Sequence, residues 1–385
     1  MTTPLTDKPP RKRSGLTLRR LEKGAIRTAT GLVNWFEWLQ REPTDVVDRT
    51  PFDVVFEQDK LQVRHYRPLN RDQDIQLGRE VMHVDANLKP VPILLIPPLM
   101  VRPFIFDLTA KRSLVRTLMR DGFEVYVVDF GVPDKADESV RLERYVLDWV
   151  PAAIDAVLRN SGAKQLTLYG YCMGGLFALL HTSVHRDPRV HSIVTIGSPI
   201  DAHKMGPLSV IVRLGHGQVD FLSRKLGNVP GPVSSAAFRM MTPFKSLTRY
   251  GDLFVNMWND EYVNGFDAVT AWTDNFIDYP GEAFRQVLHD FMLGNKFKDG
   301  TWEFAGKTAD LSAITCPVLA FAGHTDNVVP PAAALELLKL LGSTDKQFVE
   351  APGGHMGVCA GREAPKHVWL PSARWLAERQ PQRYT

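Results

Sequence analysis

The sequence predicts an α/β fold with a mostly parallel, doubly wound sheet and an inserted helical cap. Short apolar runs typical of buried strands alternate with longer helical patterns along most of the chain. One run, Gln165 to Tyr169, leads into a turn flanked by glycines. Between Asp201 and about Phe304 the sequence lacks apolar runs typical of strands, and aromatic residues and methionines are frequent there. The 385 residues, 44% of them hydrophobic, suffice for one large α/β domain with an insertion or for two smaller domains.

The expected strands begin with an antiparallel pair and continue as short buried strands. In chain order they are residues 53–56, 61–66, 93–96, 124–128, 165–169, 191–196, 317–321 and 347–349. The apolar spacing over 140–159 predicts a helix, and Pro151 is expected to split or kink it because proline removes a backbone hydrogen bond. Another helix, over 176–185, is expected behind the glycine-flanked turn.

The first 45 residues are rich in lysine and arginine and divide into a tail and a helix. Residues 1–14 predict a disordered basic tail. From Leu18 to Leu39 apolar residues recur at steps of three and four, which predicts an amphipathic helix with a basic opposite face. This helix either packs on the domain surface or docks onto an anionic or apolar surface or a partner helix. The expected divisions are the basic segment, the first part of the core, the cap and the second part of the core, at 1–45, 46–200, 201–305 and 306–385.

Charge and cysteine content exclude several functional classes. A net charge of +3 gives no electrostatic argument for nucleic-acid binding. The longest apolar stretches, such as Val91 to Met100, are too short to span a bilayer, and the N-terminus lacks the apolar stretch of a secretory signal. Three cysteines without metal-site spacing fit a reducing cytoplasm, with no disulfide framework and no metal.

Cys172 lies in the turn Gly170-Tyr171-Cys172-Met173-Gly174, after an apolar strand. This G-x-C-x-G pattern is the nucleophile elbow of the α/β-hydrolase fold, with a thiol in place of the usual hydroxyl. The glycines are needed because Cβ atoms on either side of the sharp turn would collide. No G-x-S-x-G occurs in the sequence. A thiolate both accepts and releases acyl groups readily, so the residue suits thioester exchange.

A thiol nucleophile needs a base and an acid, which follow it in chain order in this fold. Asp326 lies in the loop after a late strand and is the expected acid. His355, in Gly353-Gly354-His355 after the last strand, is the expected base, and His324 is a weaker alternative. The remaining thiols, Cys316 and Cys359, are expected to be structural.

An oxyanion hole should combine two backbone N–H groups. One is expected from Met173, directly after the nucleophile, and the other from the loop after the strand at 93–96. Leu99, Met100 and Val101 are the candidates for this second donor, and Met100 is the working assignment. In the cap, most aromatic residues are expected to form its own core and a minority to line a substrate channel.

Several stretches of this sequence, taken together, resemble the polyhydroxyalkanoate synthase family, and most closely its short class III catalytic subunits. The resemblance runs from about residue 90 to the C-terminus. It rests on Pro98 to Leu108, Val128 to Pro133, Gly170 to Gly175, Pro280 to Gln286, Ile314 to Val318, Asp326, and Gly353 to His355.

The resemblance implies an acyltransferase that takes 3-hydroxyacyl groups from coenzyme A thioesters and extends a polyester. Cys172 would carry the acyl group, His355 would be the base, and Asp326 would support His355 or help to activate the attacking hydroxyl. No cofactor is implied beyond the coenzyme A of the substrate. A second, non-catalytic subunit or a second copy of the chain is the implied partner, and the implied location is cytoplasmic, including the surface of polymer granules.

Three positions depart from the family pattern and leave the acyl group open. Val101, Asn327 and Phe130 stand where family members commonly carry Asn, His and Trp. Two alternatives to polymer synthesis also remain. One is a cysteine-dependent hydrolase, either a thioesterase or a polyester depolymerase. The other is a non-catalytic protein associated with granules or membranes, suggested by the basic N-terminal helix. Free 3-hydroxy acid as the product would indicate the hydrolase, and insoluble polymer the synthase.

Overall fold

The computed structural model describes residues 50–69, 74–77, 80–85, 87–240 and 243–381, together with scattered residues between 27 and 38. The chain divides into two compact units. Unit 1 comprises Met1–Asp45 and Phe244–Asp267, and unit 2 comprises Val46–Pro243 and Ala268–Thr385. The predicted basic tail, 1–14, lies outside the described residues.

Unit 2 is built on an eight-stranded sheet with the order β1-β2-β8-β5-β9-β10-β13-β14. β1 pairs antiparallel with β2 and β2 antiparallel with β8, whereas the other neighbours are parallel. In sheet order the strands are Phe52–Gln58, Leu61–Tyr66, Val125–Asp129, Ile93–Ile96, Leu166–Tyr171, Val190–Ile196, Val318–Gly323 and Lys346–Ala351. All eight predicted strands are therefore confirmed, including the antiparallel opening pair.

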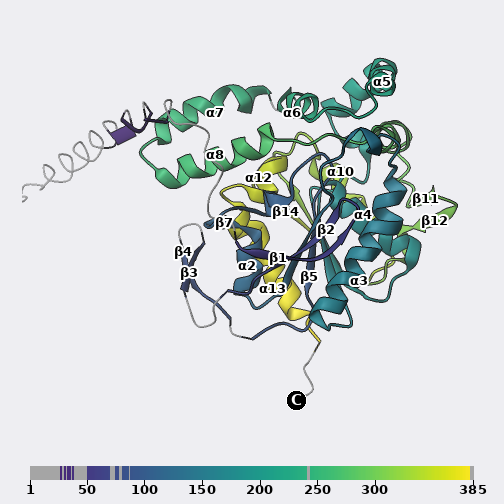
Figure 1. Cartoon of the computed structure of the whole chain (residues 1–385), viewed down its shortest axis with the longest axis horizontal. Helices are drawn as coiled ribbons and strands as arrows, with labels where there is room; N and C mark the ends of the chain where they lie inside the picture. The colour runs from purple at the N-terminus through teal and green to yellow at the C-terminus, as the bar shows by residue number, and fades with distance from the viewer. Residues whose placement is uncertain are drawn as a thin grey trace, which may run out of the picture. The chain divides into compact units, whose positions relative to one another are not determined.

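Helices cover both faces of this sheet, so the doubly wound prediction is confirmed (Figure 1). Alternate strand residues enter opposite cores: Leu94 of β5 packs with one cluster and Leu95 with the other. The first cluster includes α3 (Val150–Ser161) and α4 (Met173–His185). The second includes α2 (Leu114–Arg120), α12 (His355–Ala360), η7 (Pro365–Trp369) and α13 (Leu370–Glu378). Sites at the ends of the central strands are thus shielded from both sides.

The helix predicted over 140–159 is present and runs without a break, so Pro151 does not split it. A π-helical segment, η3 (Arg144–Trp149), precedes α3, and Pro151 lies in the first turn of α3. The N–H of Val150 donates to the carbonyl of Tyr145 in the π-helical pattern, and this wider turn lies directly before the proline. Three short hairpins have no counterpart in the prediction; they are β3–β4 (Asp74–Leu77, Glu80–His83), β6–β7 (Asp107–Thr109, Arg112–Ser113) and β11–β12 (Thr301–Phe304, Lys307–Asp310).

The stretch without predicted strands is helical. It holds α5 (Pro207–Leu226), α6 (Gly231–Met240), α7 (Pro243–Asn256), α8 (Asp260–Asp274), α9 (Gly281–Gln286) and the π-helical η5 (Val287–Leu293). Phe238, Trp272 and Phe276 are buried, but they join the core of the sheet's second face rather than a separate cap core. Phe221 on α5 is 70% exposed and belongs to no core. For these four residues the expected separate cap core is therefore wrong.

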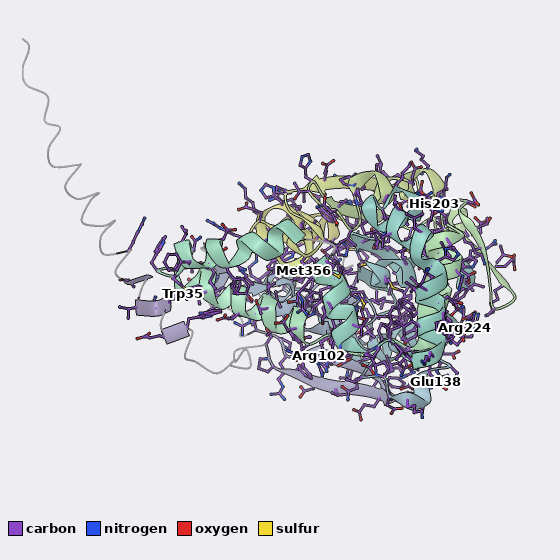
Figure 2. All side chains as sticks on the ribbon, turned by 90° about the horizontal axis from the view of Figure 1, so that it is seen from above. Trp35, Arg102, Glu138, His203, Arg224 and Met356 are labelled. Atoms are coloured by element: carbon purple, nitrogen blue, oxygen red, sulfur yellow. The ribbon has the colours of Figure 1, made fainter. Side chains whose placement is uncertain are left out.

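Unit 1 joins the described residues of the N-terminal segment, which are helical, to most of α7 and the first half of α8. Its core contains Leu253, Met257 and Val263, with Trp35 (labelled in Figure 2) and Trp38 against it. Of the two alternatives for the predicted amphipathic helix, its described residues support packing within this protein. None of the described helices has an apolar stretch long enough to cross a bilayer.

Candidate active site

The predicted elbow is formed at the carboxyl end of β9. Cys172 links β9 to α4 with φ 52° and ψ −118°, a conformation that non-glycine residues rarely adopt. Its N–H donates to the carbonyl of Ile196 at 2.8 Å, and its own carbonyl accepts from Ser198 Oγ at 2.8 Å. Such strain costs roughly 1–3 kcal/mol and persists only where neighbouring bonds fix the backbone. The two hydrogen bonds to residues at the end of β10 provide that restraint.

The glycines of G-x-C-x-G are explained by close backbone contacts. A Cβ on Gly170 would overlap the backbone of Gly175, and a Cβ on Gly174 would overlap the carbonyl of Ile96 at the end of β5. Helix α4 can therefore begin against β5 and β9 only when both positions lack a side chain. This places the half-buried Cys172 at the N-terminus of α4, where the helix dipole favours negative charge.

Asp326 follows β13 and is almost fully buried. Its Oδ1 accepts from the N–H groups of Val328 and Val329, both at 2.8 Å. Its Oδ2 accepts from Nδ1 of His355 at 2.8 Å. The two backbone donors fix the carboxylate, so that one oxygen faces the imidazole. The structure thus brings together the predicted acid and the predicted base.

His355 is the first residue of α12, directly after the loop that leaves β14. Gly353 in that loop has φ 126°, which requires glycine. The carbonyl of His355 accepts from Tyr171 Oη at 3.2 Å. Burial lowers the pKa of His355, but the charges of Asp326 and Cys172, with hydrogen bonds to both, outweigh it and raise the pKa to about 10. His355 is therefore hydrogen-bonded to Asp326 and also lies within hydrogen-bonding reach of Cys172.

The other two cysteines differ from Cys172 in their surroundings. Burial raises the pKa of Cys316 to about 12. Burial, followed by the nearby charge of Cys172, raises the pKa of Cys359 further. Neither thiol forms a thiolate near neutral pH, which supports the structural role predicted for them. His324, the weaker candidate base, is exposed and pairs with Glu350 instead of Asp326.

The loop after β5 lies beside the first turn of α4, because a Cβ on Gly174 would be 2.9 Å from the carbonyl oxygen of Pro97. Of the three candidate donors in this loop, only Met100 has a positive φ, 63°. The side chains of Leu99 and Val101 are buried. As the first residue of α4, Met173 has an N–H that the helix does not use. The assignment of these two N–H groups as oxyanion donors stays a prediction.

Sequence reasoning missed three residues around this site. Ser198 Oγ donates to the carbonyl of Cys172 in the elbow. Tyr279 Oη donates to Met173 Sδ at 3.3 Å, and Trp272 Nε1 donates to the carbonyl of Arg102 at 2.9 Å. Ser198 follows the predicted strand at 191–196, so its position beyond the carboxyl end of that strand was a usable signal. Tyr279 and Trp272 come from the cap, and no local pattern indicates that Tyr279 reaches the elbow or that Trp272 reaches the loop after β5.

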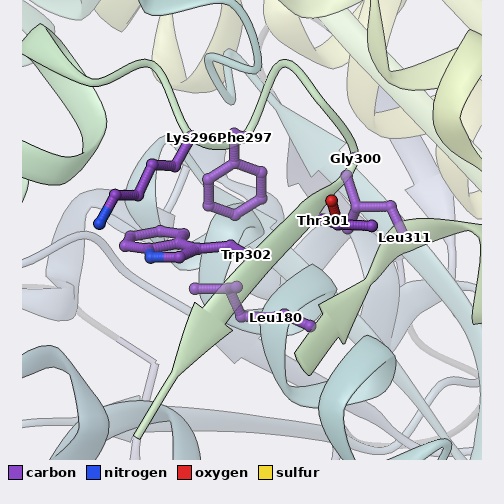
Figure 3. A pocket seen from close by; sticks show the side chains of 8 residues that line it. Leu180, Lys296, Phe297, Gly300, Thr301, Trp302 and Leu311 are labelled. Atoms are coloured by element: carbon purple, nitrogen blue, oxygen red, sulfur yellow. The ribbon is translucent and has the colours of Figure 1, made fainter. Parts of the chain in front are cut away.

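No group of three or more His, Cys, Asp or Glu side chains among the described residues is arranged to hold a metal ion. A small gap with an empty volume of about 160 Å³, partly open to solvent, lies beside the β11–β12 hairpin (Figure 3). It is lined by Leu180, Lys296, Phe297, Gly300, Thr301, Trp302, Ala309 and Leu311. Its lining is largely apolar and contains none of the three predicted catalytic residues.

Comparison with known proteins agrees with the fold. The family model of the alpha/beta hydrolase fold matches residues 105–359. The poly(3-hydroxyalkanoate) polymerase subunit PhaC of Allochromatium vinosum is 32% identical over 335 residues, covering 86% of this chain and 89% of that protein. The PhaC subunit of Haloferax mediterranei is 30% identical over 337 residues, and the chain spans 65% of its length.

Among solved structures, a soluble variant of monoglyceride lipase from Saccharomyces cerevisiae has a TM-score of 0.50 at 13% identity, covering 89% of this chain and 99% of that one. This likeness concerns the fold alone. The sequence match to the Allochromatium subunit covers 86% of this chain and 89% of that protein. The structure also has Cys172 in an elbow at the end of a central strand of the sheet. The chain therefore belongs to the PhaC family of poly(3-hydroxyalkanoate) polymerase subunits, on the alpha/beta hydrolase fold.

Proposed function

We propose that this protein is an acyltransferase that takes the acyl group of a 3-hydroxyacyl-CoA onto Cys172 and passes it to a hydroxyl group, building a polyhydroxyalkanoate. The observation that carries the proposal is the contact of His355 with both Cys172 and Asp326, at the end of a strained elbow. The naming of the relatives as poly(3-hydroxyalkanoate) polymerase subunits supports the choice of substrate.

The first half-reaction moves the acyl group from coenzyme A to the enzyme. Cys172 Sγ attacks the thioester carbonyl carbon, and the negative charge on oxygen is stabilised by the N–H groups of Met173 and Met100. The bond between this carbon and the sulfur of coenzyme A then breaks. The proton on Nε2 of His355 passes to the departing sulfur, so that coenzyme A leaves as a thiol. The Nδ1–H bond to Asp326 is kept throughout.

The second half-reaction forms the ester. A hydroxyl group, from another 3-hydroxyacyl unit or from a growing chain end, gives its proton to Nε2 of His355 and attacks the acyl carbon on Cys172. The carbon–sulfur bond breaks, and Cys172 returns as a thiolate beside the imidazolium. The pKa of His355, raised to about 10, keeps its imidazole protonated between turnovers, when Cys172 carries no acyl group.

We extend the proposal to partners and location. The relatives are named as subunits, which supports a second subunit or a second copy of the chain as a partner. Because a long polyester is insoluble, a protein that holds the growing end on Cys172 works at the surface of a cytoplasmic granule. A hydrolase would use water in place of the hydroxyl group, and a non-catalytic role would leave the buried His355–Asp326 pair without a purpose.

The test follows coenzyme A release and product solubility together. Purified protein is incubated with 3-hydroxybutyryl-CoA and with longer 3-hydroxyacyl-CoAs. We expect coenzyme A release and insoluble polymer from the wild type, and only the background rate from Cys172→Ala. Cys316→Ala is the matched control and should keep the wild-type rate. Normal turnover by Cys172→Ala would refute the role of Cys172, and soluble 3-hydroxy acid as the only product would make the protein a hydrolase.

A further inference from the structure

The two predicted oxyanion donors come from parts of the chain that are far apart in sequence. Met173 opens α4, and Met100 lies in the loop after β5. An oxyanion hole works only when both N–H groups are aimed at one point, since displacements of about 1 Å cost large factors in rate. Something must therefore fix the β5 loop relative to the first turn of α4.

One short piece of the cap contacts both parts. We call residues 272–279 the cap clamp. The N–H of Ile277 donates to the carbonyl of Met100 at 2.9 Å. Trp272 Nε1 donates to the carbonyl of Arg102 at 2.9 Å (Arg102 is labelled in Figure 2). These two bonds hold the β5 loop on either side of Val101. Because Met100 has φ 63°, its peptide groups need such restraint to keep their direction.

The other end of the clamp reaches the elbow. Tyr279 Oη donates to Met173 Sδ at 3.3 Å, and the tyrosine is buried. Burial, then the charges of Tyr145 and Cys172, raise the pKa of Tyr279 well above 10, so the phenol stays a neutral donor at all working pH values. A thioether is a weak acceptor, so this bond orients the Met173 side chain without locking it.

The clamp is itself anchored in the cap. Tyr279 and Val229 exchange backbone hydrogen bonds, both at 2.9 Å. The N–H of Gly231, at the start of α6, donates to Asp278 Oδ1 at 2.9 Å. A Cβ on Gly231 would overlap the carbonyl of Phe276, so the start of α6 lies directly on the clamp. Displacement of α6 would therefore move the clamp residues that hydrogen-bond to the β5 loop.

We propose that the cap clamp sets the geometry of the oxyanion hole, with Trp272 and Tyr279 as positioning residues that act through Arg102 and Met173. The hole is then complete only while the cap is seated, and anything that lifts α6 slows acyl transfer without altering the Cys172–His355–Asp326 contacts. The inference rests on the proposed function for the two oxyanion donors, and it deepens that function by adding a control on acylation.

The test compares two reactions of the same thiol. Acylation of Cys172 passes through an oxyanion, whereas alkylation by iodoacetamide does not. For Trp272→Phe we expect single-turnover acylation by 3-hydroxybutyryl-CoA to fall roughly ten- to a hundredfold, and for Tyr279→Phe, whose bond to a thioether is weaker, roughly two- to tenfold. The alkylation rate should stay within about twofold and KM should change little, since neither depends on the oxyanion donors. A merely structural role would lower both reactions together.

Matched controls separate this effect from the loss of any buried hydrogen bond. Tyr169→Phe removes a hydroxyl that donates to Ser372 Oγ at 3.1 Å, and Trp369→Phe removes an indole N–H that donates to the carbonyl of Cys359 at 2.7 Å. Neither should change the ratio of acylation to alkylation. Should Trp272→Phe fold poorly, benzothienylalanine at position 272 keeps the bicyclic shape and removes only the donor.

The outcome can be told apart from failure of the proposed function. p-Nitrophenyl butyrate acylates a reactive cysteine through the same kind of oxyanion without coenzyme A, so it tests the clamp even if no 3-hydroxyacyl-CoA is a substrate. Equal loss of acylation and alkylation in the clamp variants would overturn the inference. So would acylation at the wild-type rate in both variants.

Discussion

At the level of single residues, the charge state of His355 follows from its neighbours. Burial alone would make the imidazole neutral, yet the carboxylate of Asp326 at 2.8 Å and the adjacent Cys172 raise its pKa from 6.5 to about 10. Asp326 is itself held by two backbone N–H groups that satisfy its second oxygen. The three residues therefore form one unit, in which a change at any member alters the proton on the imidazole.

The raised pKa of His355 makes part of the free energy of unfolding depend on pH. The folded-state pKa of His355 lies above its ordinary 6.5, so its contribution is fully present below about pH 6.5 and is lost as the pH rises through about 10. We expect the loss of unfolding free energy in His355→Gln to be largest near pH 6 and to shrink towards pH 10, measured by urea titration. The exposed His216→Gln is the matched control for the loss of an imidazole that lies away from this site. A His355→Gln penalty that is constant from pH 6 to pH 10 would contradict the assignment.

The site residues that sequence reasoning reached are those with a local signature. Cys172, Asp326 and His355 each follow a strand in a short loop with glycines or turn residues, and the order of such loops along the chain fixes their roles. Tyr279 and Trp272 lack such a signature. Their position depends on how the cap folds back over the β5 loop, which is a long-range packing outcome that one sequence does not encode in any short pattern.

At the level of elements, the elbow depends on contacts between α4 and the strands beside it. Helix α4 begins so close to β5 that a Cβ on Gly174 would overlap the carbonyl of Ile96, a backbone atom that cannot turn away. The apolar runs that predicted the strands are reliable because both faces of this sheet are covered. The strands of the missed hairpins have two to four residues, too few for an alternating pattern to stand out from chance.

Gly174→Ala tests this element directly. The added methyl group must push α4 away from β5, so we expect a loss of unfolding free energy of roughly 1–3 kcal/mol or more, together with slower acylation of Cys172. Thermal and urea unfolding measure the first effect. The control is Gly215→Ala in α5, where an added Cβ meets nothing within 4 Å and alanine should be neutral or stabilising in a helix. Equal stability of the two variants would show that the close contact is not rigid.

At the level of the whole molecule, the chain joins segments that are distant in sequence. The sequence suggested a single cap over 201–305, but Phe244–Asp267 forms a compact unit with the N-terminal segment instead. The reason is visible in the contacts of unit 1. Trp38 Nε1 donates to Asp267 Oδ1 at 2.9 Å, Asn34 Nδ2 donates to the carbonyl of Met257 at 2.8 Å, and Trp35 packs edge-on against Phe254 at 5.2 Å. An amphipathic pattern predicts a helix but does not name the surface that its apolar stripe covers.

Trp38→Ala should therefore loosen unit 1 as a whole rather than one side chain. The substitution removes the indole donor to Asp267 and the ring contacts with Trp35 and Phe266. Because a small unit has few buried groups to compensate, we expect faster amide hydrogen exchange throughout 244–267, measured by mass spectrometry. Val33→Ala, on a side chain that is 56% exposed, is the control and should leave exchange unchanged. Wild-type protection of 244–267 in Trp38→Ala would mean that α7 and α8 are stable without the N-terminal segment, and that the predicted helix over residues 18–39 has another purpose.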